Sequence, residues 1–242
     1  MNSDTLRIAV LIDGDNAEAS LVEHILNEAG KSGRVTIKRI YADFTTSQMN
    51  GWKEQLNMHA IRPIQKFAYT KGKNSTDGAL IIDAMDILHS KLVDGFCIVS
   101  SDSDYTGIAN RIREEGLFIM GIGKSHTPEA FVKACESFTY TEILNPKKPS
   151  STKADNKEVT NFVTKKGVDY DVVESAFEMV YDDITGLALA SRLGTALKKV
   201  DPTFDIRNYG YNSFRKFLEA LKPKFETVIH DDRMTISIKR GA

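Results

Sequence analysis

The residues best suited to chemistry are acidic, and they fall where apolar runs end. Asp13 follows the run RIAVLI and opens the tetrapeptide DGDN, whereas Asp102 and Asp104 follow the run FCIVS. Asp77 stands at the predicted start of a helix over about residues 77–91. Two carboxylates ~4 Å apart repel each other by about 4 kcal/mol at an effective dielectric constant of ~20. A divalent cation between them would remove that cost.

The ligand type indicates which cation. Oxygen ligands without histidine or cysteine favour Mg²⁺ or Mn²⁺ over zinc, and these ions usually act with phosphate-bearing substrates. We predict that Asp13 is the central ligand and that Asp77, Asp102 and Asp104 complete one or two ion sites. The chemistry that follows is activation of water and neutralisation of charge at a phosphodiester under in-line attack.

A simpler interpretation is that these residues cap helices. Ser103 or Asp104 could cap the helix that follows them, and Asp15 or Asn16 could cap the first helix. This explanation fits any one acid better than it fits all four together. Asn16 also has a geometric case, because a bend at Gly14 would let its amide reach an aspartate or a metal-bound water.

Short apolar runs alternate with helical patterns through about the first 145 residues. Strands are predicted over 7–12, 35–42, 61–66, 96–100 and 117–122, and helices over about 16–30, 47–58, 77–91 and 104–115, with a last helix capped by Thr127. The alternation predicts a three-layer α/β domain with a parallel sheet covered on both faces. Ligands of such sheets bind beyond the carboxyl ends of the strands, which is where the four aspartates are expected to meet.

A second domain is predicted after a Pro- and Lys-rich break. The sequence NPKKPSSTKADNKE indicates a linker over residues 146–158, between a domain at 1–145 and a domain at 159–242. Helices are predicted over 172–181, 186–200 and 211–221, followed by a hairpin over 227–238 that turns at Asp231, Asp232 and Arg233. Three helices and a two-stranded wing are typical of a winged helix-turn-helix, which often binds nucleic acid, although protein-binding modules share this pattern.

The composition excludes several classes of protein. The chain has 242 residues, 41% of them hydrophobic and 27% charged, with a formal net charge of -1. This balance gives no global attraction to polyanions, so a site for one must be local. No run approaches the ~18 apolar residues of a membrane span, and no signal peptide is evident. We expect a cytoplasmic protein with Cys97 and Cys135 as reduced core thiols.

Two groups of basic residues are candidates for contact with a polyanionic substrate. One precedes Asp77 and the other lies near the last predicted helix: Arg62, Lys66, Lys71 and Lys73, and Arg207, Arg215 and Lys216. Charged loops are often only solvated, and the nearby Tyr209 and Tyr211 suit base stacking and core packing equally. The stretch GIGKSHTPEAF lacks the full Gly-x-Gly-x-x-Gly spacing, so it gives little support for a phosphate site at Lys124.

The order of DGDN, NSTDGALIIDAMDIL, VSSDSDY and GIGKSHTPEAF resembles a known family. Residues 6 to about 144 closely resemble the NYN family of the PIN-like superfamily, in its LabA-like branch. The resemblance implies a PIN-like fold and a metal-dependent ribonuclease. It implies site residues at these positions: Asp13, Asn16, Asp77, Asp83, Asp102 and Asp104.

Residues 159–242 resemble an OST-HTH, or LOTUS, domain through GLALASRLGTALKKVDPTFDIRNYGYNSFRKFLEAL. This resemblance implies a winged helix that binds RNA or, in some relatives, a protein partner. The segment is close to neutral, so its charge alone does not support tight nonspecific binding to nucleic acid.

Three functions follow from these patterns. The first is a Mg²⁺- or Mn²⁺-dependent ribonuclease whose C-terminal domain holds RNA. The second is a catalytically silent RNA-binding or scaffold protein that keeps the acids for structure. The third, a phosphatase of the haloacid dehalogenase type with Asp13 as nucleophile, is disfavoured because Asn16 and Ala17 follow DGD without the expected Thr.

Overall fold

The chain folds as two compact units. The computed structural model describes residues 5–67, 75–144, 167–222, 224–230 and 233–238. The units comprise residues 1–149 and 150–242, and each has a hydrophobic core of its own. The predicted linker at 146–158 lies outside the described residues. No helix in the described ranges is both long enough and apolar enough to cross a membrane.

The first unit is built on a parallel sheet. Its strands are β1 (Arg7–Asp13), β2 (Arg34–Ala42), β3 (Arg62–Gln65), β4 (Gly95–Val99), β5 (Phe118–Gly123) and β6 (Ser137–Tyr140). Their order is β3-β2-β1-β4-β5-β6, and all neighbours pair in parallel. From β1 the strand order runs outward to β2 and β3 on one side, and it restarts at β4 on the other side of β1. Ligands of open α/β sheets bind at such a switch point. The predicted three-layer α/β fold is confirmed.

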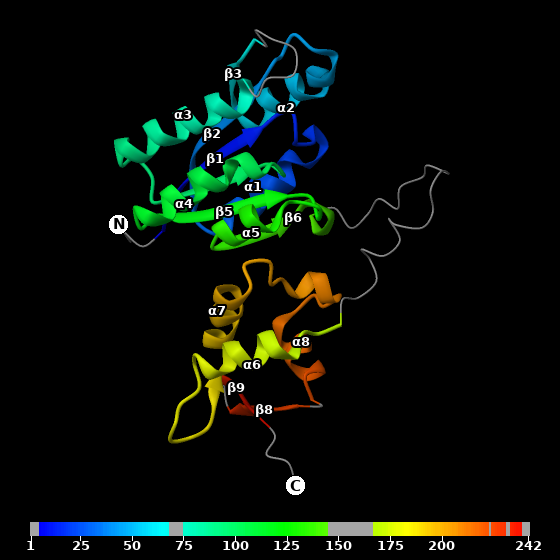
Figure 1. The fold of residues 1–242 in the computed structure, drawn as a ribbon. Helices are drawn as coiled ribbons and strands as arrows, with labels where there is room; N and C mark the ends of the chain where they lie inside the picture. The colour runs from blue at the N-terminus through cyan, green and yellow to red at the C-terminus, as the bar shows by residue number, and fades with distance from the viewer. Residues whose placement is uncertain (1–4, 68–74, 145–166, 223, 231–232, 239–242) are drawn as a thin grey trace, which may run out of the picture. The chain divides into compact units, whose positions relative to one another are not determined.

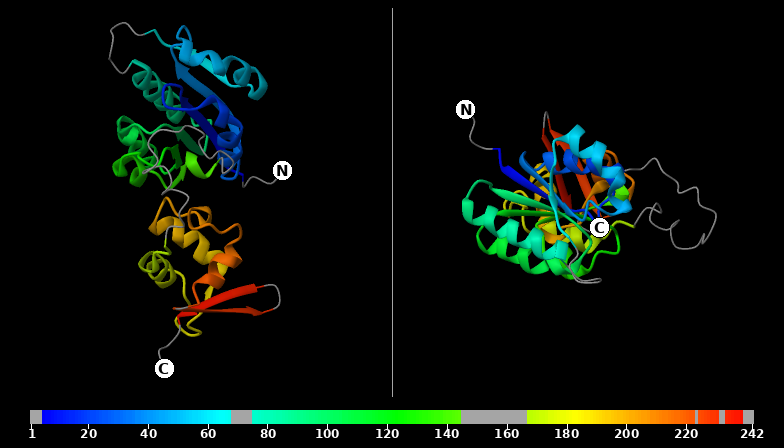
Figure 2. Two further views of the ribbon diagram at one scale, coloured as in Figure 1. Left: turned by 90° about the vertical axis from the view of Figure 1, so that its right-hand side faces the viewer. Right: turned by 90° about the horizontal axis from the view of Figure 1, so that it is seen from above.

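Helices cover both faces of this sheet, as Figures 1 and 2 show. One face packs against α1 (Val22–Gly30) and α2 (Trp52–His59), and the other against α3 (Ser75–Ser90), α4 (Thr106–Glu114) and α5 (Glu129–Ala134). The side chains of β1 explain why its sequence is apolar throughout. Ile8, Val10 and Ile12 belong to the α1 side, whereas Ala9 and Leu11 belong to the α3 side, so both faces of the strand are buried.

The edge strand β6 is missing from the sequence prediction. It pairs with β5 from Met120 opposite Ser137 to Gly123 opposite Tyr140. The close approach depends on glycine, because a Cβ at Gly121 would lie 2.4 Å from a ring carbon of Phe138. A four-residue strand directly after a short helix carries too little periodicity to be recognised. The helix before it also begins at Glu129 after Pro128, so the predicted Thr127 cap is wrong.

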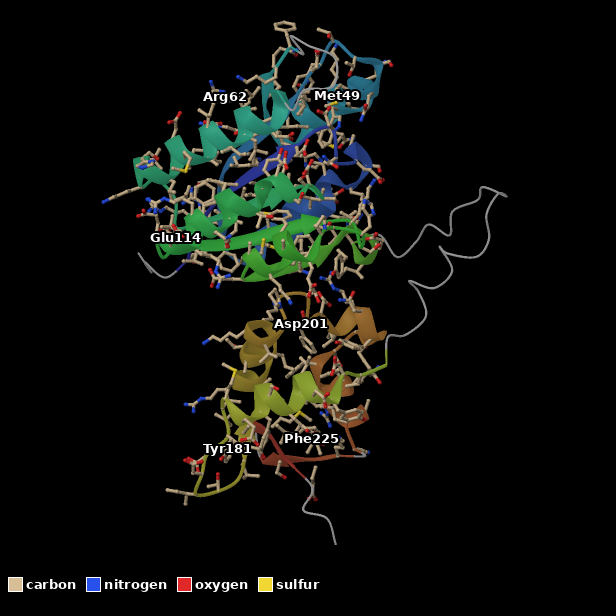
Figure 3. All side chains as sticks on the ribbon, viewed as in Figure 1. Met49, Arg62, Glu114, Tyr181, Asp201 and Phe225 are labelled. Atoms are coloured by element: carbon tan, nitrogen blue, oxygen red, sulfur yellow. The ribbon has the colours of Figure 1, made fainter. Side chains whose placement is uncertain are left out.

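The second unit combines helices with a small antiparallel sheet. Its elements are α6 (Tyr170–Glu178), β7 (Ala188–Leu189), α7 (Ala190–Val200), η6 (Ile206–Tyr209), α8 (Phe214–Ala220), β8 (Phe225–His230) and β9 (Arg233–Ile238). The sheet order is β7-β9-β8. Phe225, labelled in Figure 3, is fully buried, and its ring centroid lies 5.9 Å from that of Phe177 on α6. Helices with a hairpin of β8 and β9 fit the predicted winged-helix class.

Two predicted helix starts in this unit are wrong. The helix expected from residue 186 begins at Ala190, because Gly186 has a positive φ of 65° and residues 188–189 pair with β9 instead. The helix expected from residue 211 begins at Phe214, because the Ser213 hydroxyl caps it by accepting the Lys216 amide. The predicted hairpin is present, although its turn at Asp231 and Asp232 lies outside the described residues.

The contact between β5 and β6 generates a prediction for stability. Gly121→Ala should lower the free energy of unfolding by about 1–3 kcal/mol, because the added methyl group meets Phe138. Trp52 is the only tryptophan and is buried on α2, so its fluorescence during urea unfolding reports on this unit. Gly107→Ala on α4 is the matched control. In the part of the chain that the structure describes, no atom beyond its own stretch of helix lies within 4 Å of the new methyl group. This variant should leave stability equal or raise it by up to about 1 kcal/mol. Equal unfolding curves for the two variants would contradict this account.

Candidate active site at the carboxyl edge of the sheet

Three of the four predicted acidic ligands meet directly. Asp77 lies in the first turn of α3, whereas Asp102 and Asp104 follow β4. One carboxylate oxygen from each of these residues lies within 4.8 Å of the others. Asp13, the last residue of β1, lies beside this group but is not one of its members. Topology therefore brings together acids from distant parts of the chain, as the switch-point rule predicts.

Asp13 is fully buried and held by hydrogen bonds. Its Oδ2 accepts from Asn16 Nδ2 at 2.7 Å and from Ser100 Oγ at 2.8 Å, and its Oδ1 accepts from the Asp15 amide at 3.2 Å. Burial raises the pKa of Asp13, and the charge of Asp77 raises it further, whereas the donors from Ser100 and Asn16 oppose the shift. The donors fix the orientation of this carboxylate.

The turn after Asp13 depends on a glycine. A Cβ at Gly14 would lie 2.8 Å from the Ala42 side chain, and the Gly14 amide donates to the Tyr41 carbonyl at 2.9 Å. This close approach to β2 sends the chain back so that Asn16 faces Asp13. The expected amide contact of Asn16 is thus present, and neither Asp15 nor Asn16 caps a helix, since the 3₁₀ turn η1 (Ala19–Leu21) starts after Glu18.

Asp102 is the residue that caps, and it belongs to the acidic group as well. Its Oδ1 accepts from the Asp104 amide at 2.9 Å, which starts the 3₁₀ turn η3 (Ser103–Tyr105) that leads into α4. The predicted caps at Ser103 and Asp104 are wrong, because the extended backbone at Asp102 aims its side chain at the first amides of the turn. Ser100 accepts from the Asp102 amide at 3.1 Å and so links this turn to Asp13.

Asp77 receives a hydrogen bond from a buried tyrosine. The Tyr105 hydroxyl donates to Asp77 Oδ1 at 2.7 Å. Burial raises the pKa of the Tyr105 phenol, and nearby carboxylates raise it further, so the hydroxyl stays protonated as a donor. Burial also raises the pKa of Asp77, with further increases from the charges of Asp102, Asp104 and Asp15. The site has an excess of negative charge that its own hydrogen bonds only partly offset.

The donor set suits a hard divalent cation. Asp77, Asp102 and Asp104 each offer a carboxylate oxygen, and the group contains no thiolate or imidazole. Mg²⁺ and Mn²⁺ prefer such oxygen ligands. Asp13 is not a member of this group, so its predicted role as the central ligand stays a prediction.

Asp83, the second helix acid implied by the resemblance, has a different environment. It accepts hydrogen bonds from the Arg39 guanidinium and the Tyr41 hydroxyl, both on β2. Arg39 and Asp83 are about three-quarters buried. These contacts join α3 to the sheet and place Asp83 outside the group formed by Asp77, Asp102 and Asp104.

The predicted basic residues of the first unit are only partly described. Lys66 follows β3, is half-buried, and donates its amide to the Ala42 carbonyl at 3.0 Å. Arg62 is exposed on β3. Lys71 and Lys73 lie outside the described residues.

The basic and aromatic residues of the second unit divide into surface and core. Arg215 and Lys216 are exposed on α8, and Arg215 pairs with Glu219 at 3.1 Å. Tyr209 is buried against Phe217, with ring centroids 5.7 Å apart, so it is a core residue and not a stacking platform. Arg207 pairs with Asp205.

Two residues of the site are absent from the sequence prediction. Ser100 and Tyr105 flank the acids in the segment SSDSDY, yet each contacts an acid from another part of the chain. Their proximity to Asp102 and Asp104 in the sequence was the available signal. Their partners Asp13 and Asp77 become evident only when the strands are paired.

The charge excess predicts that removing an acid stabilises the metal-free protein. Asp77→Asn keeps an acceptor for Tyr105 and removes one charge. Because the folded-state pKa of Asp77 is raised, the wild-type carboxylate lowers stability as pH rises from the unfolded value near 4 through the folded pKa. In EDTA at pH 7 the variant should therefore unfold at a higher urea concentration, as read from Trp52 fluorescence. The gain should vanish near pH 3. A variant that is less stable than wild type at pH 7 would contradict the charge argument.

The environment of Asp83 predicts a structural phenotype. Asp83→Asn should lower the free energy of unfolding by about 2 kcal/mol, because charge-assisted hydrogen bonds to Arg39 and Tyr41 are lost. Any nuclease activity per folded molecule should stay within about threefold of wild type, because Asp83 does not belong to the acidic group. A threefold change in rate corresponds to about 0.6 kcal/mol of activation free energy. Asp86→Asn, an exposed position on the same helix, is the control for stability. A large loss of activity without a loss of stability would place Asp83 in the site.

Comparison with known proteins accounts for most of the chain. The NYN domain family matches residues 7–145, and the OST-HTH/LOTUS domain family matches residues 155–236. None of the curated proteins compared with the chain matches it.

Two solved structures are similar to parts of the chain. A crystal structure of a protein of unknown function from Vibrio parahaemolyticus is 19% identical, with a TM-score of 0.49, and the match covers 58% of this chain and 96% of that one. A solution structure of an uncharacterized protein from Nitrosomonas europaea is 24% identical, with a TM-score of 0.30, and the match covers 39% and 93%. These similarities carry no functional argument. The family matches do: the chain belongs to the NYN family and carries an OST-HTH/LOTUS domain after its NYN domain.

Proposed function

We propose that this protein hydrolyses RNA phosphodiester bonds with Mg²⁺ or Mn²⁺ and that its C-terminal domain binds RNA. The observation that carries the proposal is the group of Asp77, Asp102 and Asp104, whose oxygens lie within 4.8 Å of one another beside the buried Asp13. The NYN domain belongs to a nuclease superfamily, and the OST-HTH/LOTUS domain is an RNA-binding type of module. These two family matches support a protein that acts on or binds nucleic acid, and the metal and the hydrolysis of RNA are the proposal.

The residues of the site would divide the work. Asp77, Asp102 and Asp104 would hold the cation. When bound, a divalent ion activates water and neutralises charge on a phosphodiester. Ser100 and Asn16 hold the carboxylate of Asp13 in one orientation.

Tyr105 and the turn at Asp102 keep the acidic group assembled before substrate binds. Tyr105 donates to Asp77, and the Asp104 amide donates to Asp102, so these two carboxylates have fixed positions. Fixed ligands reduce the rearrangement needed when charge develops in the transition state. The structure would therefore present a preorganised oxygen-lined site to the metal and substrate.

The second unit would contribute binding. Arg215 and Lys216 are exposed on α8 and are suited to contact an RNA backbone. A protein partner at this domain is the alternative, because an exposed arginine and lysine suit an acidic protein surface as well as they suit RNA.

The second candidate function is a catalytically silent RNA-binding or scaffold protein. A specific observation favours it: Asp13 already accepts three hydrogen bonds and Asp102 already caps η3, so both have structural roles without a metal. The two functions differ in whether RNA is turned over.

Cleavage of single-stranded RNA tests the proposal. With Mn²⁺ the wild type should degrade RNA, and EDTA should abolish the activity. Asp102→Asn should lower kcat by about 100-fold or more, because loss of a metal ligand removes several kcal/mol of charge stabilisation. The asparagine can still accept from the Asp104 amide, so the turn is retained. Asp86→Asn, exposed on α3, is the control and should keep full activity.

The same assay separates the alternatives. Activity that survives both EDTA and Asp102→Asn would contradict metal-dependent catalysis at this site. Retention of RNA by the full chain without Mn²⁺-dependent turnover on a broad panel of RNAs would support the silent binding protein instead.

A further inference from the structure

A pocket lies next to Asp13 on the α1 side of the sheet. It opens between the start of α1 and the carboxyl ends of β4 and β5. Its apolar floor includes Ile25 and Val99. Its polar lining includes Asn16, Glu18, Ser100, Ser101 and Lys124.

This pocket shares side chains with the acidic site. Asn16 and Ser100 line it, and the same two residues donate hydrogen bonds of 2.7 and 2.8 Å to Asp13 Oδ2. Asp77 and Tyr105 reach the site from the opposite face of the sheet, where α3 and α4 pack. A strand of RNA crossing the edge between β1 and β4 would therefore pass from the acidic group to this pocket.

The backbone of Lys124 is firmly positioned at the pocket. Its amide donates to Ser101 Oγ at 2.8 Å, and its carbonyl accepts from the Thr127 amide at 3.0 Å and the Thr127 hydroxyl at 2.6 Å. The preceding Gly123 allows this packing, since a Cβ there would lie 2.4 Å from the Ser100 carbonyl oxygen. These contacts fix the main chain of Lys124, so its side chain starts from a defined place at the pocket.

The ammonium group itself is only loosely paired. Lys124 Nζ lies 3.8 Å from Glu18 Oε1, which is longer than a hydrogen bond, and the two side chains are 41% and 56% exposed. Exposed pairs of this kind contribute little to stability. A phosphate would compete well with Glu18, because it offers several strong acceptor oxygens to the same cation.

We propose that Lys124 binds a backbone or terminal phosphate of the RNA strand next to the one that reaches the acidic site. The inference rests on the proposed function for its substrate. It assigns to Lys124 a binding role and not a catalytic one. The Glu18 carboxylate lies near the Lys124 ammonium and competes with the phosphate for it.

Binding of a short, labelled single-stranded RNA to the full chain tests this role. Fluorescence anisotropy is measured with Ca²⁺ in place of Mn²⁺, so that affinity is read separately from turnover. Lys124→Gln should weaken affinity by about threefold to tenfold and reduce the salt dependence of log Kd by about 0.7, as expected for one lost phosphate contact on a single strand. Glu18→Gln should strengthen affinity by up to about threefold, because the competing carboxylate is removed.

The control is Lys133→Gln on α5, an exposed lysine that pairs with Glu129 at 2.7 Å. It removes the same charge elsewhere and should leave both affinity and salt dependence unchanged. RNAs with a 5′-hydroxyl and a 5′-phosphate distinguish the two phosphate sources. An equal loss with both RNAs supports an internal phosphate, whereas a loss confined to the phosphorylated RNA supports a terminal one.

Unchanged affinity and salt dependence in Lys124→Gln, or the same loss in Lys133→Gln, would overturn the inference. These outcomes are independent of catalysis. If the wild type binds RNA but does not cleave it with Mn²⁺, the proposed nuclease activity fails while the binding comparison still decides the role of Lys124.

Discussion

The main physical constraint on the first unit is the repulsion between carboxylates at the place where β1 and β4 end side by side. Asp13 is buried, and Asp77, Asp102 and Asp104 meet beside it. Burial and the charges of neighbouring carboxylates raise the pKa values of Asp13 and Asp77, so their ionised forms are disfavoured. Hydrogen bonds from neighbouring side chains offset part of this repulsion and cannot neutralise it. A bound cation would neutralise this charge and, under the proposed function, would supply the chemistry that phosphodiester hydrolysis needs.

The rest of the first unit positions these charges. Strand order places the ends of β1 and β4 together, and the glycine after Asp13 lets the chain turn against β2. The contacts of Asp83 with Arg39 and Tyr41 join α3 to the sheet, which fixes the helix that carries Asp77. Asp83 and Asp77 thus share one helix and differ in the side chains that face them. Asp83 accepts hydrogen bonds from Arg39 and Tyr41 of the sheet, whereas Asp77 faces further acids.

Much of this arrangement follows from local sequence, and the parts that do not have physical reasons. Strands β1, β4 and β5 are buried on both faces and continuously apolar, so these strands and the aspartates at the ends of β1 and β4 were predictable. Elements as short as β6 and β7 exist because of their pairing partners and carry little signal of their own. Likewise, periodicity shows that Asp83 lies on a helix and does not reveal Arg39 across the sheet. The capping role of Asp102 depends on its extended backbone, which the sequence alone leaves open to Ser103 and Asp104.

The central claim is that the acids at this edge hold a divalent ion. It is tested most directly by anomalous diffraction from crystals of the full chain soaked in Mn²⁺. The account predicts a manganese peak coordinated by oxygens of Asp77, Asp102 and Asp104, next to Asp13. A fully ordered site with no peak, or with manganese bound only elsewhere on the protein, would contradict it.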